Sequence, residues 1–178
     1  MNLNDSNQQW GWPGKVFHWL TALLILVQVP LGLISKEMKL SPLKLDLFVW
    51  HKSIGFIILL LVISRMLWRI NGSVPSAAAD TAIRQTLART SHGLLYALML
   101  LLPISGWIIS SAANIPISLF WLVELPAITG PDEALKEVAG TVHGTCVVLL
   151  SALLTLHIGA ALRHHFILRD NVIKRLWF

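Results

Sequence analysis

The sequence predicts an all-α membrane protein, a bundle of four transmembrane helices. Its 178 residues are 55% hydrophobic and only 13% charged, whereas soluble domains carry about 25% charged residues. The apolar residues form four blocks, each near the roughly 20 residues that a helix needs to cross a bilayer. Because hydrocarbon offers the backbone no hydrogen bonds, each block must be helical. The blocks are roughly residues 16–35, 48–70, 91–111 and 138–162.

The first block could be a cleaved signal peptide, but its features favour a helix. The leader "MNLNDSNQQWGWPGK" lacks a strongly basic start. The block is also longer than the roughly 7–15 residues of a signal core, and no A-x-A-like cleavage site follows it. We therefore predict one domain, residues 1–178, that keeps all four helices.

The basic side chains predict the orientation of the bundle, since Lys and Arg are enriched in cytoplasmic loops. Nine of the fourteen lie on the side that holds both termini, namely Lys15, Arg65, Arg69, Arg84, Arg89, Arg163, Arg169, Lys174 and Arg175. Five lie on the other side, namely Lys36, Lys39, Lys44, Lys52 and Lys136. Both termini are therefore predicted to be cytoplasmic. The net charge of +5 requires no nucleic acid, because anionic lipid is a sufficient partner.

The connection over residues 114–137 differs from the other two. Its apolar centre, "IPISLFWLVELPAI", is too short to span the membrane and is bracketed by Pro116 and Pro126. We predict that this segment lies along the outer membrane interface. Trp121 would anchor it there, as aromatic residues do at such interfaces.

Seven histidines lie in or at the ends of the predicted helices: His18, His51, His92, His143, His157, His164 and His165. Ionisable residues inside a membrane are costly and are functional candidates by default. Because consecutive helices run in opposite directions, His51 and His143 fall near the outer ends. His18, His92 and His157 fall near the cytoplasmic ends, and helix spacing alone leaves open which two of these three form a pair.

Two of these histidines belong to the same helix. His143 and His157 are fourteen residues apart, which returns the helix to within about 40° of the same direction and lifts it by about 21 Å. Both rings would therefore share one helix face, near opposite sides of the bilayer. Two histidine layers in a four-helix bundle suggest two cofactors stacked across the membrane.

The residue types favour haem over a zinc or copper ion. Such ions usually recruit carboxylates, thiolates or at least three imidazoles, but the acidic residues lie outside the spans and Cys146 is the single cysteine. Bis-imidazole ligation needs two opposed histidines and an apolar slot for a flat macrocycle. Without a C-x-x-C-H motif, the haem would be non-covalent and b-type. Occupation of both axial positions favours electron transfer over oxygen binding.

Four stretches resemble the bacterial cytochrome b561 family, the four-helix di-haem b cytochromes of the inner membrane. They are "KVFHWLTALLI", "HKSIGFIILLLVISRMLWR", "SHGLLYALMLLLPISGW" and "VHGTCVVLLSALLTLHIGAALRHHFILRDNVIKRLW". The resemblance implies that His18 and His157 ligate an inner haem and that His51 and His143 ligate an outer haem. It also implies that His92 is a pocket residue and not an axial ligand.

Basic residues near the two layers have two interpretations each. His164 and Arg65, at the cytoplasmic ends of their helices, either anchor to lipid or contact haem propionates or a quinone headgroup. Lys52, next to the outer ligand, either belongs to a solvated face or forms part of a positive funnel. Such a funnel would steer a small anion or an acidic redox protein to the outer haem.

These observations give one leading function and two alternatives. The leading function is electron transfer between a periplasmic donor or acceptor and the quinone pool. The resemblance suggests ubiquinone as one partner and superoxide as an outer donor, which would make the chain a superoxide:ubiquinone oxidoreductase. One alternative is the cytochrome b subunit of a separate dehydrogenase or hydrogenase. The other is a histidine-based metal transporter, which the lack of a carboxylate in the spans disfavours. The oligomeric state stays open, a dimer being one alternative.

Overall fold

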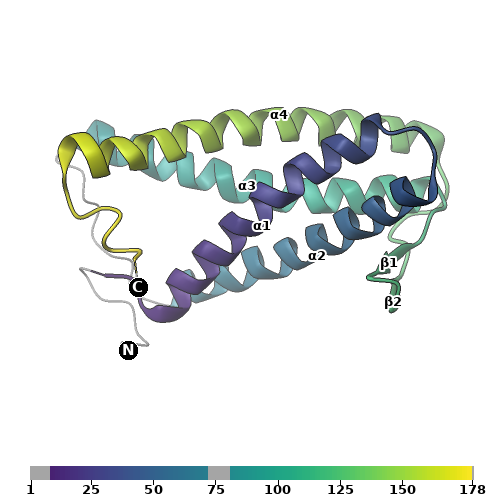
Figure 1. The fold of residues 1–178 in the computed structure, drawn as a ribbon, viewed down its shortest axis with the longest axis horizontal. Helices are drawn as coiled ribbons and strands as arrows, with labels where there is room; N and C mark the ends of the chain where they lie inside the picture. The colour runs from purple at the N-terminus through teal and green to yellow at the C-terminus, as the bar shows by residue number, and fades with distance from the viewer. Residues whose placement is uncertain (1–8, 72–80, 178) are drawn as a thin grey trace.

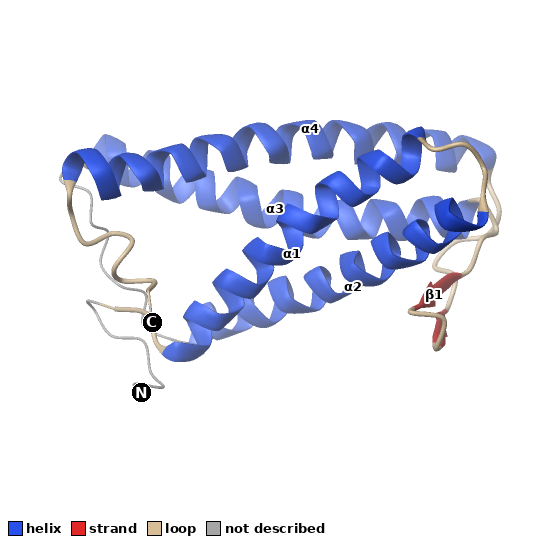
Figure 2. Cartoon of the chain, viewed as in Figure 1, coloured by secondary structure: helices blue, strands red, loops and turns tan. Residues whose placement is uncertain are grey.

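Four long helices dominate the computed structural model, which describes residues 9–71 and 81–177 (Figure 2). They are α1 (Trp12–Glu37), α2 (Pro42–Asn71), α3 (Ala82–Ala112) and α4 (Glu133–Arg163). All four are long and apolar enough to cross a membrane, which confirms the predicted fold class. Each contains one predicted span and begins several residues before it. Residues 1–8, 72–80 and 178 of the predicted domain lie outside the described residues.

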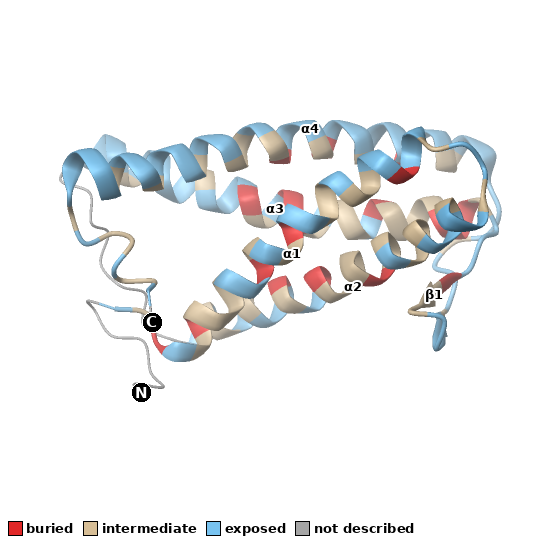
Figure 3. Cartoon of the chain, viewed as in Figure 1, coloured by how far each residue is buried: buried red, intermediate tan, exposed pale blue. Residues whose placement is uncertain are grey.

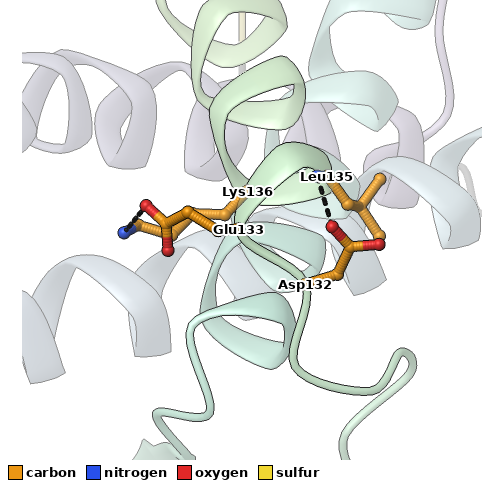
Figure 4. Close-up of polar contacts among 4 residues, drawn as sticks. All are labelled: Asp132, Glu133, Leu135 and Lys136. Carbon is orange, nitrogen blue, oxygen red and sulfur yellow. Dashed lines mark hydrogen bonds and ion pairs between the residues drawn. The ribbon is translucent and has the colours of Figure 1, made fainter.

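Polar residues outside the apolar blocks explain the early helix starts. The Asp132 carboxylate accepts a hydrogen bond from the Leu135 N–H at 3.0 Å, and Lys136 pairs with Glu133 at 2.7 Å (Figure 4). Such caps satisfy the free N–H groups of a first turn, and the carboxylate of Glu133 favours a helix N-terminus. Thr81 caps α3 in the same way. Hydropathy alone does not detect these polar first turns.

The helices run alternately up and down, so that both termini lie at one end of the bundle (Figure 1). We call this the terminus end, and the opposite end, which holds strands β1 (Ile117–Leu119) and β2 (Val123–Leu125), the hairpin end. Helix α1 packs along α2, α3 packs along α4, and α2 also meets α3. In the described part of the chain, α4 does not pack closely against α1 or α2. Side chains and a cavity therefore occupy the space between α4 and the α1–α2 pair.

The apolar core lies midway between the two ends of the bundle. Its buried members are Ile25, Ile58, Val62, Leu95, Leu98, Met99, Cys146 and Leu150. Cys146 is free and buried and packs in this core as a small apolar residue. The outward faces of the helices are largely exposed (Figure 3). Large apolar side chains on those faces fit a protein surrounded by lipid, where exposure carries no hydrophobic penalty.

The predicted interfacial segment folds into a β-hairpin. Strands β1 and β2 are antiparallel, with Ser118 opposite Glu124. Phe120 and Trp121 form the turn at φ values of 48° and 60°, a region that bulky residues rarely adopt. The prediction of an interfacial segment anchored by Trp121 did not include this strained turn. Its location at the membrane surface stays a prediction.

Contacts with α2 hold this turn in place. The Ser53 hydroxyl accepts the Phe120 N–H at 2.9 Å, and the Trp50 ring packs edge-on against Phe120 and Trp121, with ring centres 5.2 Å and 6.0 Å away. These contacts join residues that are far apart in the sequence, so the local pattern does not predict them.

The C-terminal tail returns to the first turns of α1. After a π-helical turn, η1 (His164–Leu168), Arg169 has a φ of 51° and the chain reverses direction. The Trp19 indole N–H then donates to the Leu176 carbonyl at 2.9 Å, and Lys15 donates to the Trp177 carbonyl at 2.7 Å. The tail therefore closes the terminus end beside α1.

Candidate haem-binding sites

At the hairpin end, His51 of α2 faces His143 of α4. Their ring centres lie 6.4 Å apart, with the ring planes at 70°. If two imidazoles bound one metal from opposite sides at about 2.0 Å per nitrogen, their ring centres would lie roughly 6 Å apart. The observed separation therefore fits a shared metal between the rings.

A cavity of about 440 Å³ surrounds this pair. Most of its lining is apolar, with Phe48, Phe56 and Trp107 among the larger side chains. Lys36 and Lys52 also line it, which brings positive charge to the edge of an apolar site. Such a lining suits a flat hydrophobic macrocycle with a polar edge.

Two glycines lie beside the imidazoles at the hairpin end, and one of them is needed to make room for its ring. A Cβ added at Gly32 would lie 2.5 Å from His51 Cε1, closer than side chains ever approach. A Cβ at Gly106 would lie 3.5 Å from His143 Cε1, an ordinary contact. Gly55, one turn after His51, faces Gln28 instead, with its added Cβ 3.1 Å from Nε2. Gly32 is therefore the glycine that the His51 ring requires.

The two hairpin-end rings differ in their polar neighbours. The Ser105 hydroxyl lies 3.0 Å from His143 Nδ1. The Gln28 amide donates to the backbone carbonyl of His51 at 2.8 Å. Within the described chain, His51 Nδ1 and Gln28 Oε1 are buried without a hydrogen-bond partner. Unpaired buried polar atoms are rare and indicate that this site is built for a further group.

At the terminus end, three imidazoles gather from three helices. His18 of α1 and His157 of α4 have ring centres 6.5 Å apart at 65°. His92 of α3 approaches the same His157 ring at 5.7 Å and 70°. The structure therefore brings together all three predicted candidates, and His157 is common to both contacts.

Cationic and aromatic side chains lie beside the three rings. Arg65 stacks over the Tyr96 ring at 5.6 Å, and Arg69 lies 5.9 Å from the Tyr96 and Trp10 rings. Arg65 forms no ion pair with a carboxylate in the described part of the chain. A half-buried guanidinium without an anion is suited to an acidic group of a ligand.

His164 lies apart from these contacts and pairs with an acidic residue of the tail. Its Nδ1 donates to Asp170 Oδ2 at 2.5 Å, and the backbone N–H of Val172 donates to Oδ1 at 3.1 Å. Burial raises the pKa of the Asp170 carboxyl, but the hydrogen bonds from His164 and Val172 and the nearby charges of His164 and Arg175 together hold the pKa below its usual value. The pair stabilises the bend after η1.

The donor sets fit haem better than a bare metal ion. In the described residues, no group of three or more His, Cys, Asp or Glu side chains could hold an ion. Each end instead offers opposed imidazoles, and the hairpin end adds an apolar cavity. These features suit the two axial positions of a haem iron.

Gln28, Ser105 and Tyr96 were missed by the sequence analysis. Each is a common residue type in a helix, and none belongs to a recognisable spacing pattern. Only the packing of α1 and α3 brings these side chains to the histidines. A search for polar residues one turn from each histidine would have found Tyr96, four residues after His92, but neither of the other two.

Comparison with known proteins identifies the family. A family model described as prokaryotic cytochrome b561 matches residues 9–178. Over 187 residues, the chain is 31% identical to "Cytochrome b561 homolog 2" of Escherichia coli (strain K12), covering 99% of this chain and 95% of that protein. It is 27% identical to "Cytochrome b561 homolog 1" of the same strain, covering 89% and 91%. It is 26% identical to "Probable superoxide oxidase CybB" of Yersinia pestis, covering 89% and 90%.

The match extends over nearly the whole chain and includes all four spanning helices with their histidines. Its members are membrane cytochromes, which agrees with a donor set suited to b-type haem. The protein therefore belongs to the prokaryotic cytochrome b561 family and is a multi-pass protein of the bacterial inner membrane.

Proposed function

We propose that this chain is a di-haem electron-transfer cytochrome that links the periplasmic face of the membrane to the ubiquinone pool. His51 and His143 would hold one haem b, and His18 and His157 the other. The observation that carries this proposal is the presence of opposed imidazoles at both ends, with ring centres 6.4 Å and 6.5 Å apart. These values lie close to each other and to the roughly 6 Å expected for axial ligation.

Each haem would supply one-electron redox chemistry near one side of the bilayer. The protein residues define the distance and the medium between the two sites. His143 and His157 lie on one helix, about 21 Å apart along its axis. The buried apolar core between them, which includes Ile58 and Leu150, excludes water and charged groups from the space between the two sites.

At the terminus end, the choice of ligand rests on the family resemblance. The ring-centre separations of 6.5 Å for His18–His157 and 5.7 Å for His92–His157 both lie near the roughly 6 Å of axial ligation. His92 would then be a pocket residue beside the haem. Arg65 would contact a haem propionate or a quinone headgroup, since its guanidinium is free to bind an anionic or carbonyl oxygen.

At the hairpin end, Lys36 and Lys52 line the cavity and would attract small anions. The basic residue distribution predicts that this end faces the periplasm. One relative is named a probable superoxide oxidase, and superoxide is a small anion. Two superoxide anions would each lose one electron to become dioxygen, and one ubiquinone would take up both electrons and two protons to become ubiquinol.

The first test is a dithionite-reduced minus oxidised spectrum of the purified protein, with a pyridine haemochrome count. We expect two b haems per chain. Superoxide would then reduce the protein, and added ubiquinone would reoxidise it. A chain that stays colourless when expressed with ample haem would refute the cytochrome function. If superoxide does not reduce the haem-loaded protein but a copurified dehydrogenase does, only the superoxide step would be refuted.

A further inference from the structure

Ser105 of α3 makes two contacts at the hairpin-end site. It is 5% exposed, and its hydroxyl donates to the backbone carbonyl of Leu102 at 2.9 Å. The same oxygen lies 3.0 Å from Nδ1 of His143 on α4. Two helices are therefore joined through one buried hydroxyl group.

The hydroxyl has only one proton to share between these neighbours. A carbonyl oxygen can only accept, so Ser105 donates its proton to the Leu102 carbonyl. Toward His143, the hydroxyl oxygen can then act only as an acceptor. It can then pair only with an Nδ1 that carries hydrogen. In a neutral imidazole this leaves the lone pair on Nε2, the nitrogen that can bind a metal. The arrangement therefore selects one of the two His143 tautomers.

The partner ring lacks this support. His51 Nδ1 is buried and has no side-chain hydrogen-bond partner in the described part of the chain. The Gln28 amide donates to the His51 backbone, and the Gln28 backbone, which carries no hydroxyl, lies beside the His51 ring. An acceptor on Nδ1 of a ligating histidine fixes the ring and raises its basicity. The two rings should therefore differ in how strongly they donate to a shared iron.

We propose that Ser105 is a positioning residue that holds His143 in the Nδ1–H tautomer and strengthens its donation to the hairpin-end haem iron. This inference rests on the proposed di-haem function. Stronger donation stabilises the ferric over the ferrous iron, so Ser105 lowers the reduction potential of that haem. The terminus-end haem lies outside its reach.

The test compares three variants of the full-length protein: Ser105→Ala, Ser105→Thr and Ser35→Ala. Ser105→Ala removes the hydroxyl acceptor and leaves only the Leu102 carbonyl beside the His143 ring. Ser105→Thr keeps a hydroxyl that can bond to the same helix carbonyl. Ser35 is the matched control, because it is fully buried and donates to the Leu31 carbonyl at 2.6 Å. The readout is a potentiometric titration, in which the component missing from His51→Ala protein identifies the hairpin-end haem.

We expect Ser105→Ala to change the ferric-to-ferrous stability ratio of that haem by about tenfold, a rise of about 59 mV for one electron. The ferric low-spin electron paramagnetic resonance signal of the same haem should shift. Ser105→Thr and Ser35→Ala should leave both unchanged. If Ser105→Ala loses the hairpin-end haem, retention in Ser105→Thr supports the role of the hydroxyl.

Three results would overturn the inference: equal potentials in Ser105→Ala and Ser35→Ala, an equal shift in Ser105→Thr, or loss of the haem from both Ser105 variants. Failure of the proposed function is a separate outcome, because it appears in the wild-type protein as the absence of two haems. A haem-free wild-type chain would be tested by ¹⁵N NMR of His143. Hydrogen on Nε2 would then refute the tautomer assignment.

Discussion

The hairpin end and the terminus end of the bundle surround their histidines differently. The hairpin-end pair lies in a cavity of about 440 Å³. Ser105 contacts the His143 ring, and the absence of a side chain at Gly32 leaves room for the His51 ring. The terminus end holds three imidazoles beside Arg65 and Tyr96. The hairpin end thus has a single histidine pair whose two rings have different polar neighbours, and the terminus end has one ring, His157, that contacts two other histidines.

This difference teaches that equal donor spacing does not produce equal sites. Both ends have a ring pair about 6.5 Å apart, but the second layer differs in charge. At the hairpin end a hydroxyl lies beside a proposed axial histidine, whereas at the terminus end a guanidinium would face the acidic groups of a bound haem. The two proposed haems should therefore differ in reduction potential even though both would have two histidines as axial ligands.

The largest expected effect separates the two ends completely. His51→Ala or His143→Ala should remove one of the two haems, because one axial ligand is lost, and should leave the terminus-end haem in place. A pyridine haemochrome count per chain measures this change. His165→Ala, which alters a histidine outside both pairs, should keep both haems. Loss of both haems from a folded variant, or of neither, would disprove the pairing.

The second prediction concerns the shared ring at the terminus end. His18→Ala should lose the terminus-end haem, whereas His92→Ala should retain it with a shifted spectrum, because His92 is assigned as a neighbour and not a ligand. The same haem count, with reduced-minus-oxidised spectra, distinguishes the two variants. If His92→Ala loses the haem and His18→Ala keeps it, the ligand assignment must be exchanged.

The third prediction sharpens the steric contrast. Gly32→Ala should push the His51 ring away from its position opposite His143, since the added Cβ would lie 2.5 Å from Cε1. Such overpacking costs about 1–3 kcal/mol of stability. The hairpin-end haem should then transfer faster to excess apomyoglobin. Gly140→Ala, where an added Cβ meets nothing within 4 Å, is the control. Equal transfer rates in the two variants would show that the ring has room to shift.

The smallest effect lies outside the membrane, at the bend after η1. His164→Ala should raise the pKa of Asp170 toward its usual value, because it removes the hydrogen bond that lowers it. The lowered folded-state pKa means that this carboxylate stabilises the fold above its unfolded pKa, and that the contribution is lost as pH falls through the folded value. A ¹³C NMR titration of Asp170 measures the shift. His165→Ala should not change it.

Much of the fold follows from patterns local in sequence. Four apolar blocks predicted four spanning helices because hydrocarbon leaves the backbone no alternative. The helix ends were less well predicted, since Asp132 and Thr81 extend helices into polar sequence. The hairpin was missed because it depends on Ser53 and Trp50, which lie far from it in the chain.

The histidine layers show the same division between sequence and structure. Helix direction and the spacing of His143 and His157 alone placed the rings at two depths and on one face of α4. The contacts of His157 with both His18 and His92, the need for glycine at Gly32 and the hydrogen bond of Ser105 became visible only in the folded protein. Periodicity determines where a residue lies along its own helix. The rotation and separation of neighbouring helices determine which side chains meet, and these depend on packing across the whole bundle.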